Sequence, residues 1–235
     1  MKRFWNTATI APSGPGFAVL LDGRRVHLPG GPELQIRPRR LAEAIADEWQ
    51  AAGGAKDGEM SFADTPLTRL AGTAQQRVAL DPAATADAIA RYGENDLLCY
   101  RAASPEALVR RQARLWQPWL DWAALTYDAP LRVTSGVAPI RQHRDSVAAL
   151  RRAVAALDVE VLAALGIAVP ALGSLVLGLA LAADKLDAPG AHALGALDEL
   201  FQAEQWGEDS EAVTRREAIA ADIALAARFI ALTKE

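Results

Sequence analysis

Two segments combine large aromatic side chains with isolated acids, and they are the candidates for a catalytic or binding site. One runs from DLLCYR at Asp96–Arg101 to WQPWLDW at Trp116–Trp122, and the other is FQAEQWGED at Phe201–Asp209. Carboxylates could transfer protons, whereas aromatic rings could anchor a partner. Neither segment holds a nucleophile beside a base, a set of metal ligands or a glycine loop for phosphate. The pattern therefore favours recognition over catalysis.

Motifs for catalysis or metal binding are missing elsewhere in the sequence. The histidines His27, His143 and His192 have no second histidine or cysteine at ligand spacing. Ser174 lies in LGSLV, which lacks the second glycine of a nucleophile elbow, and Gly14–Gly16 precedes a strand instead of following one. We therefore expect no catalytic residue, no metal and no cofactor.

The composition narrows the class of partner. The chain has 235 residues and a formal net charge of -4, which argues against binding along a nucleic-acid backbone. A basic cluster near the N-terminus is expected to be solvated, or at most to form a rim contact. Its members are Arg24, Arg25, Arg37, Arg39 and Arg40.

The sequence also indicates a compartment. Cys99 is the only cysteine, so an intramolecular disulfide is excluded, and the composition fits a reducing environment. The N-terminal MKRFWNTATIAPSGPGF lacks the apolar core and cleavage site of a secretory signal. The most apolar stretch, Ala171–Ala183, is shorter than the roughly 20 residues that cross a bilayer, which favours a buried helix. We expect a cytoplasmic protein without membrane insertion.

The N-terminal region predicts a small antiparallel sheet. Phe17–Leu21 and Arg24–Leu28 flank Asp22-Gly23, a dipeptide that tolerates the positive φ angles of a tight hairpin turn. Glu33–Arg37 alternates apolar and polar residues like a third strand, and Met60–Phe62 could return to the sheet.

From Pro38 onward almost every segment predicts a helix, with Leu41, Ile45 and Trp49 sharing one face of the first. The expected helices are Pro38–Ala52, one starting at Pro66, one from Pro82 to Gly93, one from Pro105 that Pro118 kinks or ends, Pro139–Leu157, Asp158–Leu165, Pro170–Leu186, Ala188–Gln205 and Ser210–Leu232. The fold class is therefore α+β. We expect a small N-terminal antiparallel β domain with one packed helix at residues 1–64, followed by a larger all-helical bundle at residues 65–235.

Three tryptophans recur along one predicted helix. Trp116, Trp119 and Trp122 are three residues apart, so they gather along one slowly turning stripe. Core packing is the simpler interpretation, because an alanine-rich bundle needs large rings to fill its gaps. Anchoring of a partner is the alternative.

Seven short motifs follow one another in the order found in a known family. They are RFW at Arg3–Trp5, LDGR at Leu21–Arg24, IADEW at Ile45–Trp49, DLLCYR, QARLWQPWLDW, GSLVL at Gly173–Leu177 and FQAEQWG. The chain resembles the F-type ATP synthase assembly chaperones, a family shared by mitochondria and some bacteria that binds the alpha subunit of the soluble catalytic sector. The resemblance spans nearly the whole chain. It implies a small β domain and a larger helical domain, no cofactor and no turnover. The sequence shows no mitochondrial presequence, which indicates a bacterial member.

The resemblance also implies a task. Such a chaperone shields the surface of the unassembled alpha subunit until the beta subunit replaces it, because an exposed apolar interface invites aggregation. The alternative is an enzyme or a small-molecule-binding protein with a site in the interdomain cleft.

We expect the partner contacts in the C-terminal acidic and aromatic segment, where the family resemblance implies an important acid without fixing which one. The expected contacts are Glu199, Phe201, Gln202, Glu204, Trp206, Glu208 and Asp209. A second set is expected to be structural, and it comprises Trp49, Asp96, Tyr100, Trp116, Trp119 and Trp122.

Overall fold

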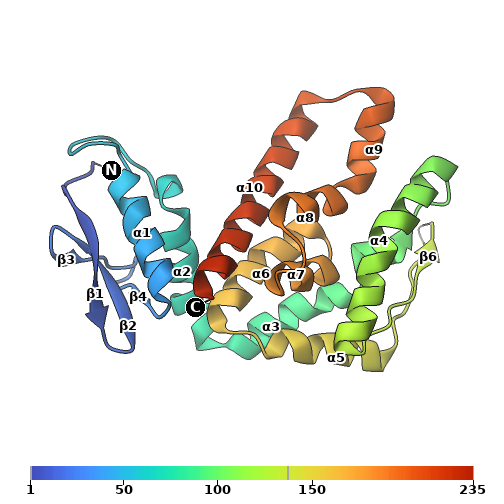
Figure 1. Ribbon diagram of the computed structural model, residues 1–235, viewed down its shortest axis with the longest axis horizontal. Helices are drawn as coiled ribbons and strands as arrows, with labels where there is room; N and C mark the ends of the chain where they lie inside the picture. The colour runs from blue at the N-terminus through green and yellow to red at the C-terminus, as the bar shows by residue number, and fades with distance from the viewer. Residues whose placement is uncertain (1, 137, 235) are drawn as a thin grey trace. The chain divides into compact units, whose positions relative to one another are not determined.

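The computed structural model describes residues 2–136 and 138–234, and the chain divides into two compact units (Figure 1). The first unit comprises Met1–Asp81, Val159–Ala164 and Arg228–Glu235, and the second comprises Pro82–Asp158 and Leu165–Ala227. A small antiparallel sheet precedes a larger helical region, so the predicted α+β class is confirmed. The domain boundary expected between residues 64 and 65 stays a prediction.

The sheet of the first unit is antiparallel throughout. Its strands are β1 (Ala8–Ser13), β2 (Gly16–Leu21), β3 (Arg24–Arg25) and β4 (Gln35–Ile36), and β2 pairs with each of the other three. The predicted hairpin turn is confirmed, with φ angles of 48° at Asp22 and 79° at Gly23. A Cβ atom on Gly16 would lie 2.4 Å from the carbonyl oxygen of Ile36, so only glycine permits the close approach of β4 to β2.

Strand β1 was not expected from the sequence. Its residues, ATIAPS, combine alanine and proline, which favour strands poorly. Pairing along its whole length, from Ala8 opposite Leu21 to Ser13 opposite Gly16, overrides this weak local preference.

Helix α1 (Arg39–Ala51) packs on strands β1 and β2 with the predicted face. Leu41, Ile45 and Trp49 are all buried, as their four-residue spacing requires. The Trp49 indole donates a hydrogen bond of 2.9 Å to Thr68 Oγ1, and the Trp5 indole donates one of 3.1 Å to the Trp49 carbonyl oxygen. The two tryptophan rings meet edge to face at 5.1 Å. Trp49 therefore joins α1 both to the N-terminal segment and to the next helix.

A buried arginine completes the C-terminal end of α1. The Arg3 guanidinium donates to five backbone carbonyl oxygens, those of Trp5, Asn6, Gln50, Ala52 and Gly54, at 2.6 to 3.3 Å. The last carbonyl groups of a helix have no hydrogen-bond donor within it, and the Arg3 guanidinium supplies donors at this end of α1.

A carboxylate completes the start of helix α2 (Pro66–Gln76). Glu48 accepts hydrogen bonds from the Leu67 amide at 2.6 Å, the Thr68 amide at 3.0 Å and the Thr68 hydroxyl at 2.8 Å. Burial raises the pKa of Glu48, and these three bonds partly oppose that shift. The carboxylate thus fixes α2 beside α1 within the first unit.

The strand expected at Met60–Phe62 is wrong. The chain instead forms a 3-10 helix, η1 (Phe62–Asp64), which begins with a reciprocal cap between Ser61 and Asp64. The Ser61 hydroxyl and the Asp64 carboxylate satisfy each other's backbone amides, and this local capping overrides the apolar run.

Helices dominate the rest of the chain. After η2 (Val78–Leu80) come α3 (Pro82–Ala90), η3 (Arg91–Glu94), η4 (Leu97–Cys99), β5 (Tyr100–Arg101), α4 (Glu106–Tyr127), β6 (Thr134–Ser135), α5 (Arg144–Ala155), α6 (Val159–Leu172), α7 (Leu175–Ala182), α8 (Ala188–Gly195), α9 (Leu197–Trp206) and α10 (Ser210–Thr233). Strands β5 and β6 form a short parallel pair that the sequence did not predict.

Helix α4 continues through Pro118, so the expectation that the proline ends the helix is wrong, while the alternative of a kink stays a prediction. Proline removes one backbone hydrogen bond. Trp116 and Leu120 are buried on either side of it, so packing holds both halves of the helix in place.

The apolar stretch Ala171–Ala183 is core, as predicted, but it is not one helix. Gly173, with a φ angle of 63°, ends α6, and the Ser174 hydroxyl accepts a hydrogen bond from the Leu177 amide to start α7. Residues Leu175 to Leu181 are all buried. Within the described residues, no helix combines the length and the apolar character needed to cross a bilayer. The expected helix Ala188–Gln205 is likewise two helices, which meet at Ala196.

Replacing Trp49 with arginine should reduce the free energy of unfolding by roughly 3–5 kcal/mol, because the new charge would be buried without a partner. Urea denaturation followed by circular dichroism measures this change. Trp206→Arg is the matched control, since Trp206 is 83% exposed and its replacement should leave stability nearly unchanged. Equal stability of the two variants would contradict the structural role of Trp49.

Candidate functional site

The predicted partner contacts lie on α9 and on the turn between α9 and α10. Gly207 ends α9 with a φ angle of 90°, a conformation that favours glycine. The Asp209 carboxylate then accepts a hydrogen bond of 2.9 Å from the Ala212 amide and caps α10. Helices α9 and α10 therefore form a helical hairpin, visible in orange and red in Figure 1. We call Leu197–Ala227 the α9–α10 hairpin.

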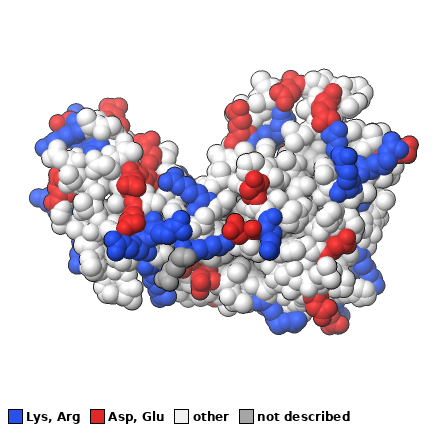
Figure 2. Space-filling model, in the orientation of Figure 1, with Lys and Arg blue, Asp and Glu red and all other residues white. Residues whose placement is uncertain are grey.

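Two of the three glutamates among the predicted contacts, Glu199 and Glu208, share one arginine. Arg216 on α10 donates to Glu199 at 3.2 Å and to Glu208 at 2.9 Å, and only 8% of its side chain is exposed. Arg215 adds a second bond to Glu199 at 2.8 Å. The arginine is buried while both acids reach the surface, and these pairs tie α10 to the first turn of α9 and to the turn between the helices. Figure 2 shows acidic and basic side chains interleaved over this part of the molecule.

The third acid is held by α4. Arg111 donates to Glu204 at 2.7 Å, and this hydrogen bond lowers the pKa of Glu204. The same guanidinium lies 5.1 Å from the centre of the Phe201 ring, and Phe201 is buried. One arginine of α4 thus fixes an acid and an aromatic residue of α9.

The remaining predicted contacts are exposed. Gln202, Trp206 and Asp209 all lie at the surface, and Trp206 is 83% exposed beside the glycine that ends α9. The exposed indole leaves a large apolar surface and an N–H donor available to a partner. The hairpin therefore presents the exposed ring of Trp206 beside predicted acidic contacts that are already engaged. Partner contact by these seven residues remains a prediction.

Asp96 occupies a buried helix start. Its carboxylate accepts hydrogen bonds from the Leu98 amide at 3.0 Å and from the Val176 amide at 2.9 Å, so it joins the DLLCYR segment to the first turn of α7. Burial raises the pKa of Asp96 to about 6, against the opposing effect of these hydrogen bonds. Tyr100, from the same segment, donates its hydroxyl hydrogen to Asn95 at 3.0 Å.

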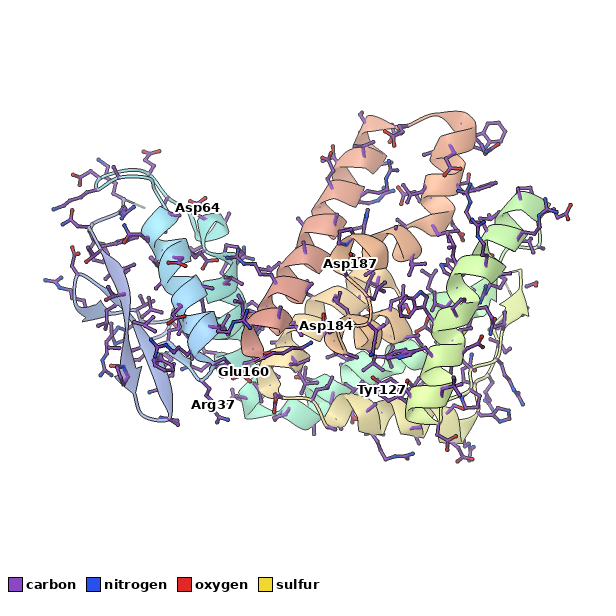
Figure 3. All side chains as sticks on the ribbon, viewed as in Figure 1. Arg37, Asp64, Tyr127, Glu160, Asp184 and Asp187 are labelled. Atoms are coloured by element: carbon purple, nitrogen blue, oxygen red, sulfur yellow. The ribbon has the colours of Figure 1, made fainter. Side chains whose placement is uncertain are left out.

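The three tryptophans of α4 have different surroundings. Trp116 is buried, and its indole donates to the Leu194 carbonyl oxygen at 3.0 Å. Trp119 and Trp122 are partly exposed, with ring centres 6.2 Å apart, and Trp122 meets Tyr127 edge to face at 5.3 Å. Tyr127, labelled in Figure 3, ends the helix. Trp116 thus belongs to the core, whereas the other two form an aromatic flank on α4.

Sequence reasoning missed a polar network around Trp116. Arg101 donates to the carbonyl oxygens of Leu98 at 2.8 Å and Gln112 at 2.7 Å, and it lies 5.4 Å from the centre of the Trp116 ring. The Gln112 amide in turn donates to Asp198 on α9 at 2.7 Å. Spacing along the chain gives no signal for these contacts, because Gln112 and Asp198 are 86 positions apart.

Neither metal ligation nor thiol chemistry finds support in the residues that the structure describes. Among the described residues, no group of three or more histidines, cysteines, aspartates or glutamates could hold a metal ion. Burial raises the pKa of the Cys99 thiol to about 12, so the thiolate needed for nucleophilic attack is scarce at neutral pH.

Comparisons with known proteins agree with the resemblance noted in the sequence. The family model described as ATP12 chaperone protein matches residues 2–124. The crystal structure of Atp12 from Paracoccus denitrificans is similar, with 45% sequence identity, a TM-score of 0.94 and coverage of 99% of this chain and 98% of that one. The Atu1473 protein of Agrobacterium tumefaciens is 38% identical, with a TM-score of 0.90 and coverage of 99% of this chain and 85% of that one.

The raised pKa of Asp96 predicts a specific pH dependence of stability. Because the folded state holds this proton more tightly than the unfolded state does, the stability contributed by the neutral carboxyl is greatest below its ordinary pKa of 3.8 and falls as the pH rises to about 6. Asp96→Asn lacks this titration. Relative to the original protein, the variant should gain about 2 kcal/mol of unfolding free energy between pH 4.5 and pH 7.5.

Urea denaturation of both proteins at the two pH values tests this, since the difference between them cancels the other titrating groups. A difference that does not change with pH would show that Asp96 is ionised in the folded protein at pH 4.5.

Proposed function

Because the chain belongs to the ATP12 chaperone family, a family of ATP synthase assembly chaperones, we propose that it binds the unassembled alpha subunit of F-type ATP synthase. The single observation that best supports a protein partner is Trp206, a tryptophan that is 83% exposed at the end of α9. Tryptophan is enriched among the residues that dominate binding energy at protein interfaces.

The surroundings of Trp206 suit this role. An anchor binds more strongly when its scaffold is already ordered, because less conformational entropy is lost on association. The pairs of Arg216 with Glu199 and Glu208, and of Arg111 with Glu204, hold α9 in place before any partner arrives. We infer that these acids first order the hairpin and that their outer oxygen atoms then contact the partner.

The proposed task is to cover a subunit-interface surface of the alpha subunit until the beta subunit replaces the chaperone. An interface of standard size, about 1,600 Å² in total, gives reversible binding over a wide range of affinities. The beta subunit then displaces the chaperone, because it buries more surface of the alpha subunit in the assembled ring. The chaperone itself works in the bacterial cytoplasm and needs neither a cofactor nor a catalytic step.

Replacement of Trp206 by alanine should weaken capture of the alpha subunit at least tenfold, because the loss of a central aromatic anchor costs about 2 kcal/mol or more. Titration of purified alpha subunit against the immobilised chain measures the dissociation constant. Leu125→Ala is the matched control, since Leu125 is 88% exposed on α4 of the same unit. Equal weakening by both variants, or by neither, would sink the assignment of Trp206 as the anchor.

Neutral and reversed charges separate the two roles of the acids. Glu199→Gln, Glu204→Gln and Glu208→Gln keep the side-chain shape and should reduce capture only modestly, whereas lysine at each position should reduce it strongly by repelling the arginines. Circular dichroism checks folding, and added beta subunit should displace the captured alpha subunit. Undiminished capture by all three lysine variants would remove the acids from the site, and failure of the unsubstituted chain to capture the alpha subunit would refute the function.

A further inference from the structure

A groove of about 390 Å³ opens on the first unit, between the segment that follows β3 and helix α2. Its floor is apolar, formed by the buried side chains of Val26, Leu28 and Trp49. Phe62 forms a wall, and 58% of this large ring is exposed. An apolar hollow with an exposed aromatic wall is typical of a binding surface.

One arginine lies at the rim of the groove. Arg69 lines it and is exposed, and its guanidinium has no hydrogen-bond or ion-pair partner among residues 2–136 and 138–234. His27 lines the same groove. None of the described residues that line it is an aspartate or a glutamate. An unpaired cation above an apolar floor suits an anionic group carried next to an apolar one.

Two acids close in sequence to lining residues are already engaged. The Glu48 carboxylate already accepts hydrogen bonds from the amides that begin α2. Asp64, labelled in Figure 3, accepts a hydrogen bond of 2.7 Å from the Ser61 amide and lines a separate hollow with Lys2. Neither carboxylate is therefore available to neutralise Arg69.

The groove is also preformed. Trp49 is fixed by its hydrogen bond to Thr68, whose hydroxyl is bonded in turn to Glu48. On the opposite side, a Cβ atom on Gly72 would lie 2.9 Å from Leu28 Cδ2, so glycine lets α2 approach the loop closely. A rigid floor lowers the entropy lost when a ligand binds.

We propose that this groove docks a segment of the alpha subunit in which an apolar side chain stands next to a carboxylate. The apolar side chain enters between Phe62 and the floor, and the carboxylate pairs with Arg69. The inference rests on the proposed function, and it adds a second contact surface on the sheet-containing unit, separate in sequence from the α9–α10 hairpin.

Two variants and two matched controls test the groove in the full chain. Arg69→Glu and Phe62→Ser should each raise the dissociation constant for purified alpha subunit at least tenfold. Arg77→Glu changes the same charge at the end of α2 outside the groove, and Leu80→Ser removes an apolar side chain that is 81% exposed and also outside it. Both controls should stay within twofold of the original value, and Phe62→Leu should restore binding. Circular dichroism confirms that each variant is folded.

The outcomes are distinguishable. If the unsubstituted chain binds the alpha subunit and the groove variants bind as well as the controls do, the groove is overturned while the proposed function stands. Equal weakening by Arg69→Glu and Arg77→Glu would indicate general charge attraction and would also overturn it. If sedimentation shows a dimer of the chain that Phe62→Ser dissociates, the occupant is a second copy and the proposal is wrong. If the unsubstituted chain does not bind at all, the proposed function fails and this inference fails with it.

Discussion

Buried helix ends are the constraint on which this structure depends. A helix leaves its first amides and last carbonyls without partners, and an unpaired buried group of this kind costs about 1–3 kcal/mol. Here charged side chains from elsewhere in the chain supply the partners. Arg3 serves the end of α1, Glu48 serves the start of α2, and Asp96 serves the start of α7. Each of these side chains therefore fixes the position of an element as well as satisfying its backbone.

Charged side chains from distant parts of the chain also hold the candidate site in place. In the α9–α10 hairpin the buried partner is an arginine, Arg216, and the acids around it reach the surface. Arg111 plays the corresponding part for Glu204 from α4. An acidic segment that looks solvated in the sequence is thus ordered before any partner binds, and Trp206 is left as the free apolar group.

Local signals predicted the elements well, and they failed where distant contacts decide. The Asp22-Gly23 hairpin and the buried face of α1 follow from turn chemistry and from four-residue spacing. Strand β1 and the β5–β6 pair depend on partners elsewhere in the chain. Their short and weakly β-forming sequences therefore did not predict strands. At the candidate site, the sequence pointed to the acids and aromatic residues of α9 as partner contacts, which stays a prediction. It could not show their arginine partners, because Arg111 and Glu204 are 93 positions apart.

The acceptors of Arg3 have a consequence for how the protein responds to its solvent. All five are neutral carbonyl oxygens, so the cation is held by dipoles at short range. Dissolved ions weaken attraction between exposed opposite charges far more than they weaken such buried contacts. Raising the ionic strength should therefore weaken the exposed pair of Arg215 with Glu199, while leaving the pairs of the buried Arg216 and the end of α1 nearly intact. Salt concentration would then act as a selective probe of the exposed ion pairs on the α9–α10 hairpin.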